Sequence, residues 1–136
     1  MNKKGFTLVE LLATIVLLCL VTLIATFTIN KSVRDAKNRS HNAQVETIIS
    51  AGISYTNKEE NIDLNNINGY KIYLSELHNK GYIENAIKDP LNDKMINMDS
   101  SYIEIKIATS VNNNQSDIKD YKYNGKYVYE LHIVYE

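Results

Sequence analysis

The stretch that decides the fold is Lys3-Lys4-Gly5-Phe6-Thr7-Leu8-Val9-Glu10-Leu11-Leu12, which opens a long apolar run. From Phe6 to Ile29 the run has 24 residues and one formal charge, Glu10. As a helix it would be about 36 Å long, because each residue adds about 1.5 Å, and a bilayer's hydrocarbon core is about 30 Å thick. The sequence therefore predicts a membrane-spanning helix over residues 6–30.

Two residues in this stretch are unusual for a plain membrane anchor. Glu10 places a carboxylate in the apolar run, where an acidic residue near a helix centre costs about 2.5–3.5 kcal/mol. Gly5 separates Lys3 and Lys4 from the run, although a simple anchor requires no glycine there. A secretory signal peptide does not fit either, because its apolar region is only about 7–15 residues long and precedes a small-residue cleavage site. A plain anchor leaves both Gly5 and Glu10 unexplained.

The residues from Lys3 to Leu12 closely resemble the processing signal of the type IV pilin superfamily. That superfamily includes pilins, type II secretion pseudopilins and competence pseudopilins. Its pattern is a short basic leader, Gly, a hydrophobic residue that is usually Phe, and then Thr-Leu-Val/Ile-Glu-Leu-Leu/Met, and this chain matches every position. The resemblance implies that a membrane-embedded prepilin peptidase cuts between Gly5 and Phe6. It also implies that the new amino group of Phe6 is N-methylated.

The resemblance implies an assembly role for Glu10. A carboxylate in lipid must find a partner or become protonated. Cleavage would create an ammonium group on Phe6, four residues from Glu10, so that pairing within one helix is geometrically possible. In the superfamily the equivalent Glu pairs with the terminal amine of a neighbouring subunit. We carry that role to Glu10.

Composition limits the remaining possibilities. The length of 136 residues allows one domain beyond the anchor, and loss of Lys3 and Lys4 with the leader leaves 13 basic and 16 acidic residues. This balance gives no electrostatic case for bulk binding to nucleic acid. The only cysteine, Cys19, lies in the apolar run, which excludes a disulfide-stapled domain. Basic residues flank both ends of the run, so only the resemblance places the leader on the cytoplasmic side.

The helix is expected to continue beyond the membrane to about Thr56. Apolar and small residues recur there at mostly three- and four-residue steps, which is typical of an amphipathic helix. The expected face consists of Val33, Ala36, Ser40, Ala43, Ile48, Ala51 and Tyr55. Gly52 falls inside this pattern, and we interpret it as a site of close packing rather than a helix break.

The rest of the chain reads as short strands and turns. Tyr70 to Tyr73 is short and extended, and Ser75 to Lys80 is expected to form a small helix that Gly81 ends. Ile103, Ile105 and Ile107 alternate with polar residues or alanine, which indicates a strand with one apolar face. Asn124-Gly125 is typical of a type I′ hairpin turn, and the strand after it is expected to run from Tyr127 to Tyr135.

We therefore predict an α+β fold with three parts. These are a prepilin leader peptide (residues 1–5), a transmembrane and polymerisation segment (6–30) and an extracytoplasmic globular domain (31–136). In this fold a small antiparallel β-sheet of three to four strands packs on the second half of the long N-terminal helix. Because tyrosine supplies ten of the twelve aromatic residues, much of the sheet is expected to be half-buried.

No residue pattern points to a catalytic or cofactor site. Asp89, Asn92, Asp93 and Asp99 offer the oxygen ligands that calcium prefers, but their spacing matches no defined calcium loop, so we expect a solvated turn. The three histidines, His41, His78 and His132, fall in separate elements without zinc-ligand spacing. The lysines Lys119, Lys122 and Lys126 could contact DNA phosphates, but Asp117 and Asp120 offset them. Catalytic motifs are absent, and we predict that the chain is not an enzyme.

The resemblance implies that the chain is a structural subunit of a type IV pilus or pseudopilus. Such a subunit is inserted in the cytoplasmic membrane, cleaved and methylated, and then polymerised through its N-terminal helix into an extracellular or cell-envelope filament. Its expected partners are copies of itself or related pilins, the prepilin peptidase, membrane lipid and an assembly platform protein. Two alternatives stay open: a competence-type pseudopilin that takes part in DNA uptake, and a minor pilin that acts as an adhesin or initiates assembly.

Overall fold

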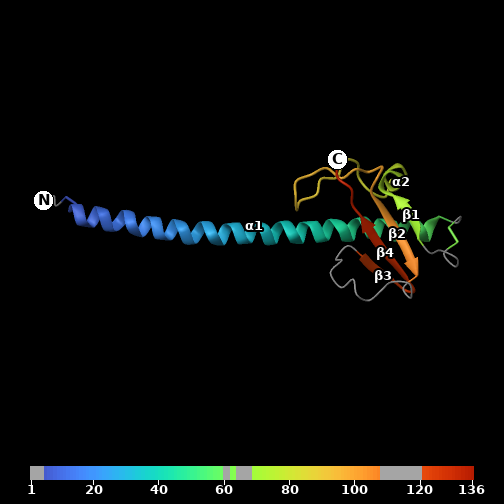
Figure 1. Ribbon diagram of the computed structural model, residues 1–136, viewed down its shortest axis with the longest axis horizontal. Helices are drawn as coiled ribbons and strands as arrows, with labels where there is room; N and C mark the ends of the chain where they lie inside the picture. The colour runs from blue at the N-terminus through green and yellow to red at the C-terminus, as the bar shows by residue number, and fades with distance from the viewer. Residues whose placement is uncertain (1–4, 60–61, 64–68, 108–120) are drawn as a thin grey trace. The chain divides into compact units, whose positions relative to one another are not determined.

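The computed structural model describes residues 5–59, 62–63, 69–107 and 121–136 and divides into two units, residues 1–36 and 37–136. A single helix, α1, runs from Leu8 to Lys58 (Figure 1). Its ends lie within two residues of the predicted ones. Four strands and a second, short helix follow α1 in the chain. The structure is an α+β fold with an antiparallel sheet, as predicted.

The part of α1 that belongs to the second unit buries one face. The buried residues are Val45, Ile48, Ile49, Gly52, Tyr55 and Thr56. Their three- and four-residue spacing confirms the amphipathic period. The predicted face is only partly right, because Ser40 and Ala43 are exposed and Ala51 is half-buried. The apolar stripe is centred on the larger side chains Val45 and Ile49, which bury more apolar area than alanine or serine can.

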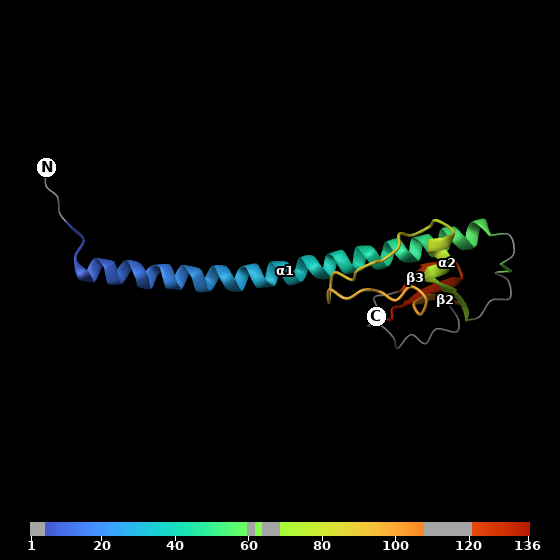
Figure 2. The same cartoon turned by 90° about the horizontal axis from the view of Figure 1, so that it is seen from above.

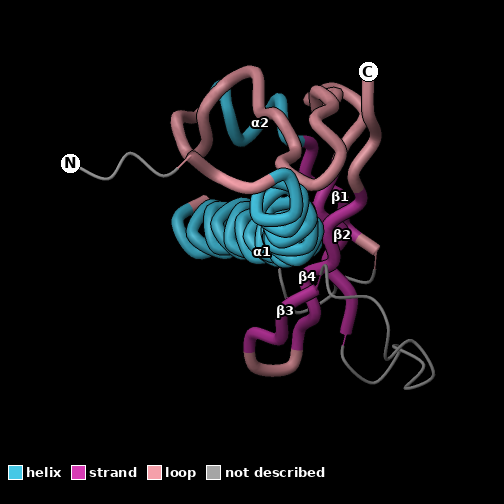
Figure 3. Tube along the Cα trace, turned by 90° about the vertical axis from the view of Figure 1, so that its left-hand side faces the viewer, coloured by secondary structure: helices cyan, strands magenta, loops and turns pink. Residues whose placement is uncertain are grey.

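The sheet has four strands in the order β1-β2-β4-β3, and all neighbouring pairs are antiparallel (Figure 3). The strands are β1 (Tyr70–Tyr73), β2 (Tyr102–Ile107), β3 (Tyr121–Asn124) and β4 (Tyr127–His132). The central pair places Ile103 opposite Leu131 and Ile105 opposite Tyr129. Because side chains alternate along a strand, these four residues share one face of the sheet.

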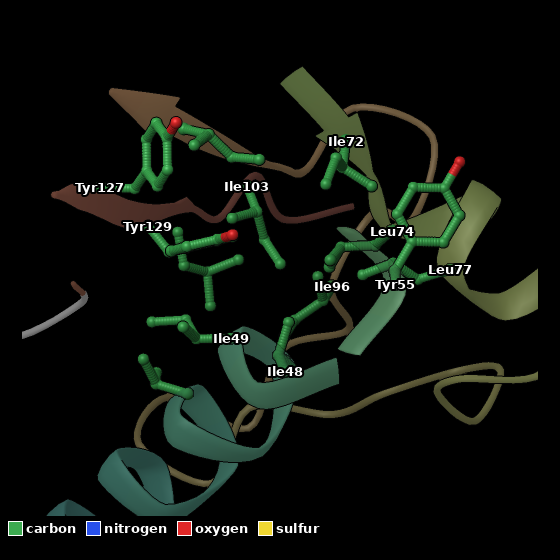
Figure 4. Close-up of a cluster of buried hydrophobic side chains, with 13 residues drawn as sticks. Ile48, Ile49, Tyr55, Ile72, Leu74, Leu77, Ile96, Ile103, Tyr127 and Tyr129 are labelled. Carbon is green, nitrogen blue, oxygen red and sulfur yellow. The ribbon is translucent and has the colours of Figure 1, made fainter. Parts of the chain in front are cut away.

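This face and the buried face of α1 form the core (Figure 4). Ile103 and Ile105 of β2 are fully buried together with Ile48 and Ile49 of α1. The sheet is more buried than expected at two of its tyrosines, because Tyr127 is buried and Tyr129 is fully buried. The Tyr129 hydroxyl lies 2.8 Å from Thr56 Oγ1, and this hydrogen bond satisfies the one polar atom that burial would otherwise leave unpaired.

Two details of the C-terminal hairpin differ from the prediction. The two turn residues are Gly125 and Lys126, because Asn124 still pairs with Tyr127 in the ladder. Gly125 has φ 63 and Lys126 is not among the residues with positive φ, which is the pattern of a type II′ turn rather than type I′. The last strand ends at His132 instead of Tyr135, because beyond it Val134 bonds to Asn97 and Ser101 rather than to the ladder.

The short helix α2 (Leu74–Asn79) follows β1 directly, and its Leu74 and Leu77 are buried. The helix starts and ends one residue earlier than the predicted range of Ser75 to Lys80. Gly81 has φ 82 and ends the helical segment, as predicted. The Tyr55 hydroxyl of α1 donates a hydrogen bond to the Glu76 carboxylate of α2. This bond, together with burial, raises the pKa of Tyr55 well above its usual range.

The segment after α2 runs alongside the second unit's part of α1 (Figure 2). Two contacts fix it there: Gln44 Nε2 donates to the Lys88 carbonyl at 3.0 Å, and His41 Nδ1 lies 2.8 Å from Asp89 Oδ1. The sheet and this segment therefore pack on the same helix.

Candidate functional site

The predicted processing site lies outside the helix. Gly5, Phe6 and Thr7 precede α1, which begins at Leu8, and all three residues are exposed. A side chain added at Gly5 would meet no atom within 4 Å. The peptide bond between Gly5 and Phe6 is thus in non-helical, accessible backbone, which is the form that a peptidase can bind.

Thr7 and Glu10 form a reciprocal cap on the first turn of α1. The Glu10 amide donates to Thr7 Oγ1 at 3.2 Å, and the Thr7 amide donates to Glu10 Oε2 at 3.2 Å. This is the capping-box arrangement, in which the N-cap residue and the third helical residue satisfy each other's backbone N–H groups. This box is a further feature beyond those predicted above, although the spacing Thr7-x-x-Glu10 is its sequence signature.

The box gives the Glu10 carboxylate a partner within the uncleaved chain. In the uncleaved chain the Phe6 nitrogen belongs to a peptide amide and carries no charge, so it cannot pair with Glu10 as an ammonium. A carboxylate near a helix N-terminus is also favoured by the helix dipole. Glu10 is therefore held, before any cleavage, one turn from the place where a new positive charge would appear.

The apolar run of α1 is exposed along its length. Phe6, Leu8 and Phe27 are 87%, 84% and 77% exposed, and the other large apolar residues as far as Ile29 are exposed too. In the part of the chain that the structure describes, α1 is the helix that is long and apolar enough to cross a membrane. Its Thr14, Thr22, Thr26 and Thr28 hydroxyls each donate to the carbonyl four residues earlier. These bonds leave none of the four hydroxyls as a free donor, which suits a lipid environment.

Asp89, one of the calcium candidates, is fully buried and accepts three hydrogen bonds. His41 Nδ1 lies 2.8 Å from Oδ1, the Leu91 amide donates to the same oxygen at 2.9 Å, and the Tyr135 hydroxyl donates to Oδ2 at 2.6 Å. Burial alone would raise the pKa of Asp89, but the hydrogen bonds from Tyr135, Leu91 and His41 outweigh it and hold the pKa below its usual value. Through these hydrogen bonds, Asp89 connects α1, the segment after α2 and the C-terminal residues.

The other calcium candidates do not gather around Asp89. The Asp93 carboxylate pairs with Lys37 at 3.0 Å and with Lys88 at 3.8 Å. The hydrogen bond and the charge of Lys37 lower the pKa of Asp93. Asn92 accepts a hydrogen bond from the Lys94 amide, and the Asp99 amide donates to Asn97. In the described residues the side-chain oxygens of Asp89, Asn92 and Asp93 thus bond to protein atoms rather than converge on one point.

Two of the three lysines that could contact DNA phosphates lie in the described part of the hairpin. Lys122 lies 3.5 Å from the Glu46 carboxylate, and the Lys126 ammonium lies over the Tyr127 ring. Lys119, Asp117 and Asp120 lie outside the described residues. In the described part of the hairpin, one lysine is thus paired with a carboxylate and the other makes a cation–π contact. These two lysines do not form a continuous basic surface for DNA.

A comparison with protein families found a match for the N-terminal segment. Residues 1–26 match the family described as the prokaryotic N-terminal methylation motif. The match covers the leader residues, Gly5, Phe6, the Thr7–Glu10 cap and most of the apolar run. Comparisons with curated proteins and with solved structures gave no match.

Proposed function

We propose that this chain, which carries the N-terminal methylation motif that is the hallmark of type IV pilin and pseudopilin precursors, is a structural subunit of a type IV pilus-like filament. The observation that carries the proposal is the coincidence of this motif with the start of an exposed apolar helix. In this proposal the precursor is anchored in the cytoplasmic membrane by α1. A prepilin peptidase cuts it after Gly5 and methylates Phe6, and an assembly platform protein delivers it to the filament.

The geometry around the cut supports the processing step. The Gly5–Phe6 bond is exposed and non-helical, and the capping box fixes the helix start two residues beyond it. A protease needs extended backbone at the bond it cuts, because helical backbone keeps its N–H and C=O groups in internal hydrogen bonds. The cap thus keeps the cleavage site free of the helix.

The exposed apolar run supports the polymerisation step. An exposed apolar helix surface of this length needs lipid or protein to cover it in water. Before assembly the bilayer covers it, and in a filament the same residues of neighbouring subunits would cover one another. The transfer between these two apolar surroundings exposes little apolar area to water, so it is compatible with a reversible cycle of extraction and assembly.

Glu10 would set the register of neighbouring subunits. Cleavage converts the Phe6 amide into an ammonium, and a buried carboxylate that meets an ammonium in an apolar medium forms a short charge-assisted contact. If the ammonium belongs to the next subunit, the contact fixes one axial step, because any other step leaves both charges unpaired in an apolar environment. The Glu10 carboxylate then accepts a bond from the ammonium of another chain, either in addition to its bond from the Thr7 amide or in place of it.

Mass spectrometry of the membrane-extracted protein tests the proposal. The expected mature chain begins at a methylated Phe6. The matched variant Gly5→Ala should remain uncleaved while the domain folds normally, since a side chain at Gly5 meets no neighbouring atom. An intact N-terminus in cells that contain an active prepilin peptidase would refute the proposal.

A further inference from the structure

The face of the sheet that points away from the core carries a cluster of charged residues. Glu104 and Lys106 of β2 alternate with the buried Ile103 and Ile105, so they lie on this outer face. The register of β2 and β4 places Glu130 directly opposite Glu104. Two carboxylates directly opposite each other on a sheet repel, and a folded domain needs a cation to offset them.

His132 contributes a nitrogen that has no hydrogen-bond partner. Its Nε2 atom is buried and makes no hydrogen bond, although the side chain as a whole is 34% exposed. It faces Glu104 Oε2 at 3.3 Å and Glu130 Oε1 at 3.4 Å. The His132 ring is stacked on Tyr102 with a centroid separation of 4.8 Å, which holds the ring in place.

We propose that Glu104, Glu130 and His132 form a binding site for Zn²⁺. The three ligand atoms lie within 4.8 Å of one another. A tetrahedral Zn²⁺ site with bonds of about 2.0–2.2 Å has ligand atoms about 3.3–3.6 Å apart. The two distances from Nε2 to the carboxylate oxygens agree with this edge length. A metal ion between these atoms would give the buried nitrogen a coordination bond in place of the hydrogen bond that it lacks.

The ligand set selects zinc over the hard cations. Calcium and magnesium prefer oxygen ligands in six or more positions, whereas an imidazole nitrogen with two carboxylates suits zinc and its first-row neighbours. Three protein ligands leave one position of the tetrahedron for water or for a group from another molecule. The site is independent of the N-terminal segment and therefore of the proposed filament role.

Lys106 is the natural competitor for this site. Its ammonium lies 3.4 Å from Glu104 Oε2 and 3.2 Å from Glu130 Oε2. It offsets only one of the two negative charges, and a divalent ion offsets both. Because the lysine stem is long and flexible, the ammonium can move into solvent when a metal arrives. We therefore expect Lys106 to weaken zinc binding rather than to support it.

The test is zinc titration of the untagged full-length chain in detergent micelles, after removal of metals with a chelator and dialysis. Competition with a chromogenic zinc chelator gives the affinity, and Co²⁺ serves as a second probe because its visible absorption reports tetrahedral geometry. The variants are His132→Ala, Glu104→Gln and Lys106→Met. His78→Ala is the matched control, since His78 is a half-buried histidine that faces the Ile83 carbonyl instead of a carboxylate.

We expect the wild-type chain to bind about one Zn²⁺. Loss of an outer-shell partner costs about 10–100-fold in metal affinity, so loss of the His132 ligand should cost at least about 100-fold. Glu104→Gln should also weaken binding, His78→Ala should not, and Lys106→Met should bind Zn²⁺ more tightly. Near-ultraviolet circular dichroism shows whether each variant is folded. Equal zinc affinity in folded His132→Ala and wild type, or no zinc binding by wild type, would overturn the proposal.

Discussion

Gly52 of α1 lies so close to Ile103 of β2 that a Cβ atom at position 52 would be 2.6 Å from Ile103 Cδ1. Real Cβ atoms do not approach other carbons so closely. The remaining Ile103 atoms near this point, Cγ1 and Cγ2, are both at 3.8 Å, an ordinary contact distance. At this point of the core, the backbone of α1 at Gly52 is in direct contact with the Cδ1 methyl group of Ile103.

This contact predicts that Gly52→Ala destabilises the domain. Alanine improves helix propensity by about 1 kcal/mol, but overpacking a buried site costs about 1–3 kcal/mol, so we expect a net loss of about 1 kcal/mol. Thermal unfolding followed by near-ultraviolet circular dichroism measures it. That signal reports the second unit, because all ten tyrosines lie between Tyr55 and Tyr135.

Ile103→Val supplies the control, because it removes Cδ1, the one atom that the new methyl group meets closer than 3.4 Å. The double variant Gly52→Ala/Ile103→Val should be more stable than the sum of the two single effects by about 1 kcal/mol. Strict additivity would show that the clash does not determine the cost.

A second prediction separates two roles of Glu10. Glu10→Gln keeps a side chain that can complete the capping box with Thr7 but removes the charge. If pairing with the Phe6 ammonium sets the filament register, Glu10→Gln and Glu10→Leu should both insert and be cleaved, yet both should fail to assemble. Filaments sheared from cells and processed monomer left in the membrane are quantified by immunoblotting.

Thr7→Ala and Glu10→Asp are the controls for this prediction. Thr7→Ala removes the acceptor for the Glu10 amide, costs about 1 kcal/mol of helix capping and leaves the carboxylate in place, so assembly should continue. Glu10→Asp keeps the charge on a shorter stem and should assemble partially. Normal filament yield from Glu10→Gln would show that the cap, and not the charge, is what assembly requires.

A third prediction concerns Asp89. Asp89→Ala leaves the Tyr135 hydroxyl, the Leu91 amide and His41 without their buried acceptor, so the free energy of unfolding should fall by about 3 kcal/mol or more. Asp93→Ala, at an exposed lysine-paired position nearby, should leave it nearly unchanged, because exposed ion pairs contribute little to stability. Similar losses in both variants would contradict the assignment of a structural role to Asp89 in particular.

Asp89 also predicts the pH dependence of stability. Its pKa is lower in the folded protein than the ordinary value of about 3.9. The unfolded chain therefore takes up a proton first as the pH falls. The contribution of Asp89 is complete above about pH 5 and is lost as the pH falls through the folded pKa below about 4. Denaturant unfolding at a series of pH values should show a shallower acid slope for Asp89→Asn than for wild type.

A fourth prediction concerns the buried pair of Thr56 and Tyr129. Thr56 Oγ1 donates to the Ile53 carbonyl at 2.9 Å and lies 2.8 Å from the Tyr129 hydroxyl. Thr56→Val keeps the shape but removes the partner of a fully buried hydroxyl, which should cost about 1–3 kcal/mol. The double variant Thr56→Val/Tyr129→Phe should recover part of this loss, since both polar groups are then gone. No recovery would mean that the hydroxyl finds another partner.

The sequence was sufficient for every feature that depends on neighbours in the chain. The long helix follows from the apolar run and the amphipathic period, and its ends lie within two residues of prediction. The processing motif, Gly81 as a helix stop and the alternation of β2 are likewise local patterns. The Thr7–Glu10 cap belongs to the same class, because the two residues are three positions apart and the pattern was present in the sequence.

Tertiary structure decided the features that depend on strand register and on long-range packing. The hairpin turn is Gly125-Lys126 because pairing with β4 extends through Asn124 and shifts the loop by one residue. Asp89 became a buried structural acceptor because its partners His41 and Tyr135 come from positions 48 and 46 residues away. Glu104 and His132 meet only because β2 pairs with β4 in one register. Periodicity shows which face a residue lies on, but only packing of the whole domain determines which residue lies opposite it.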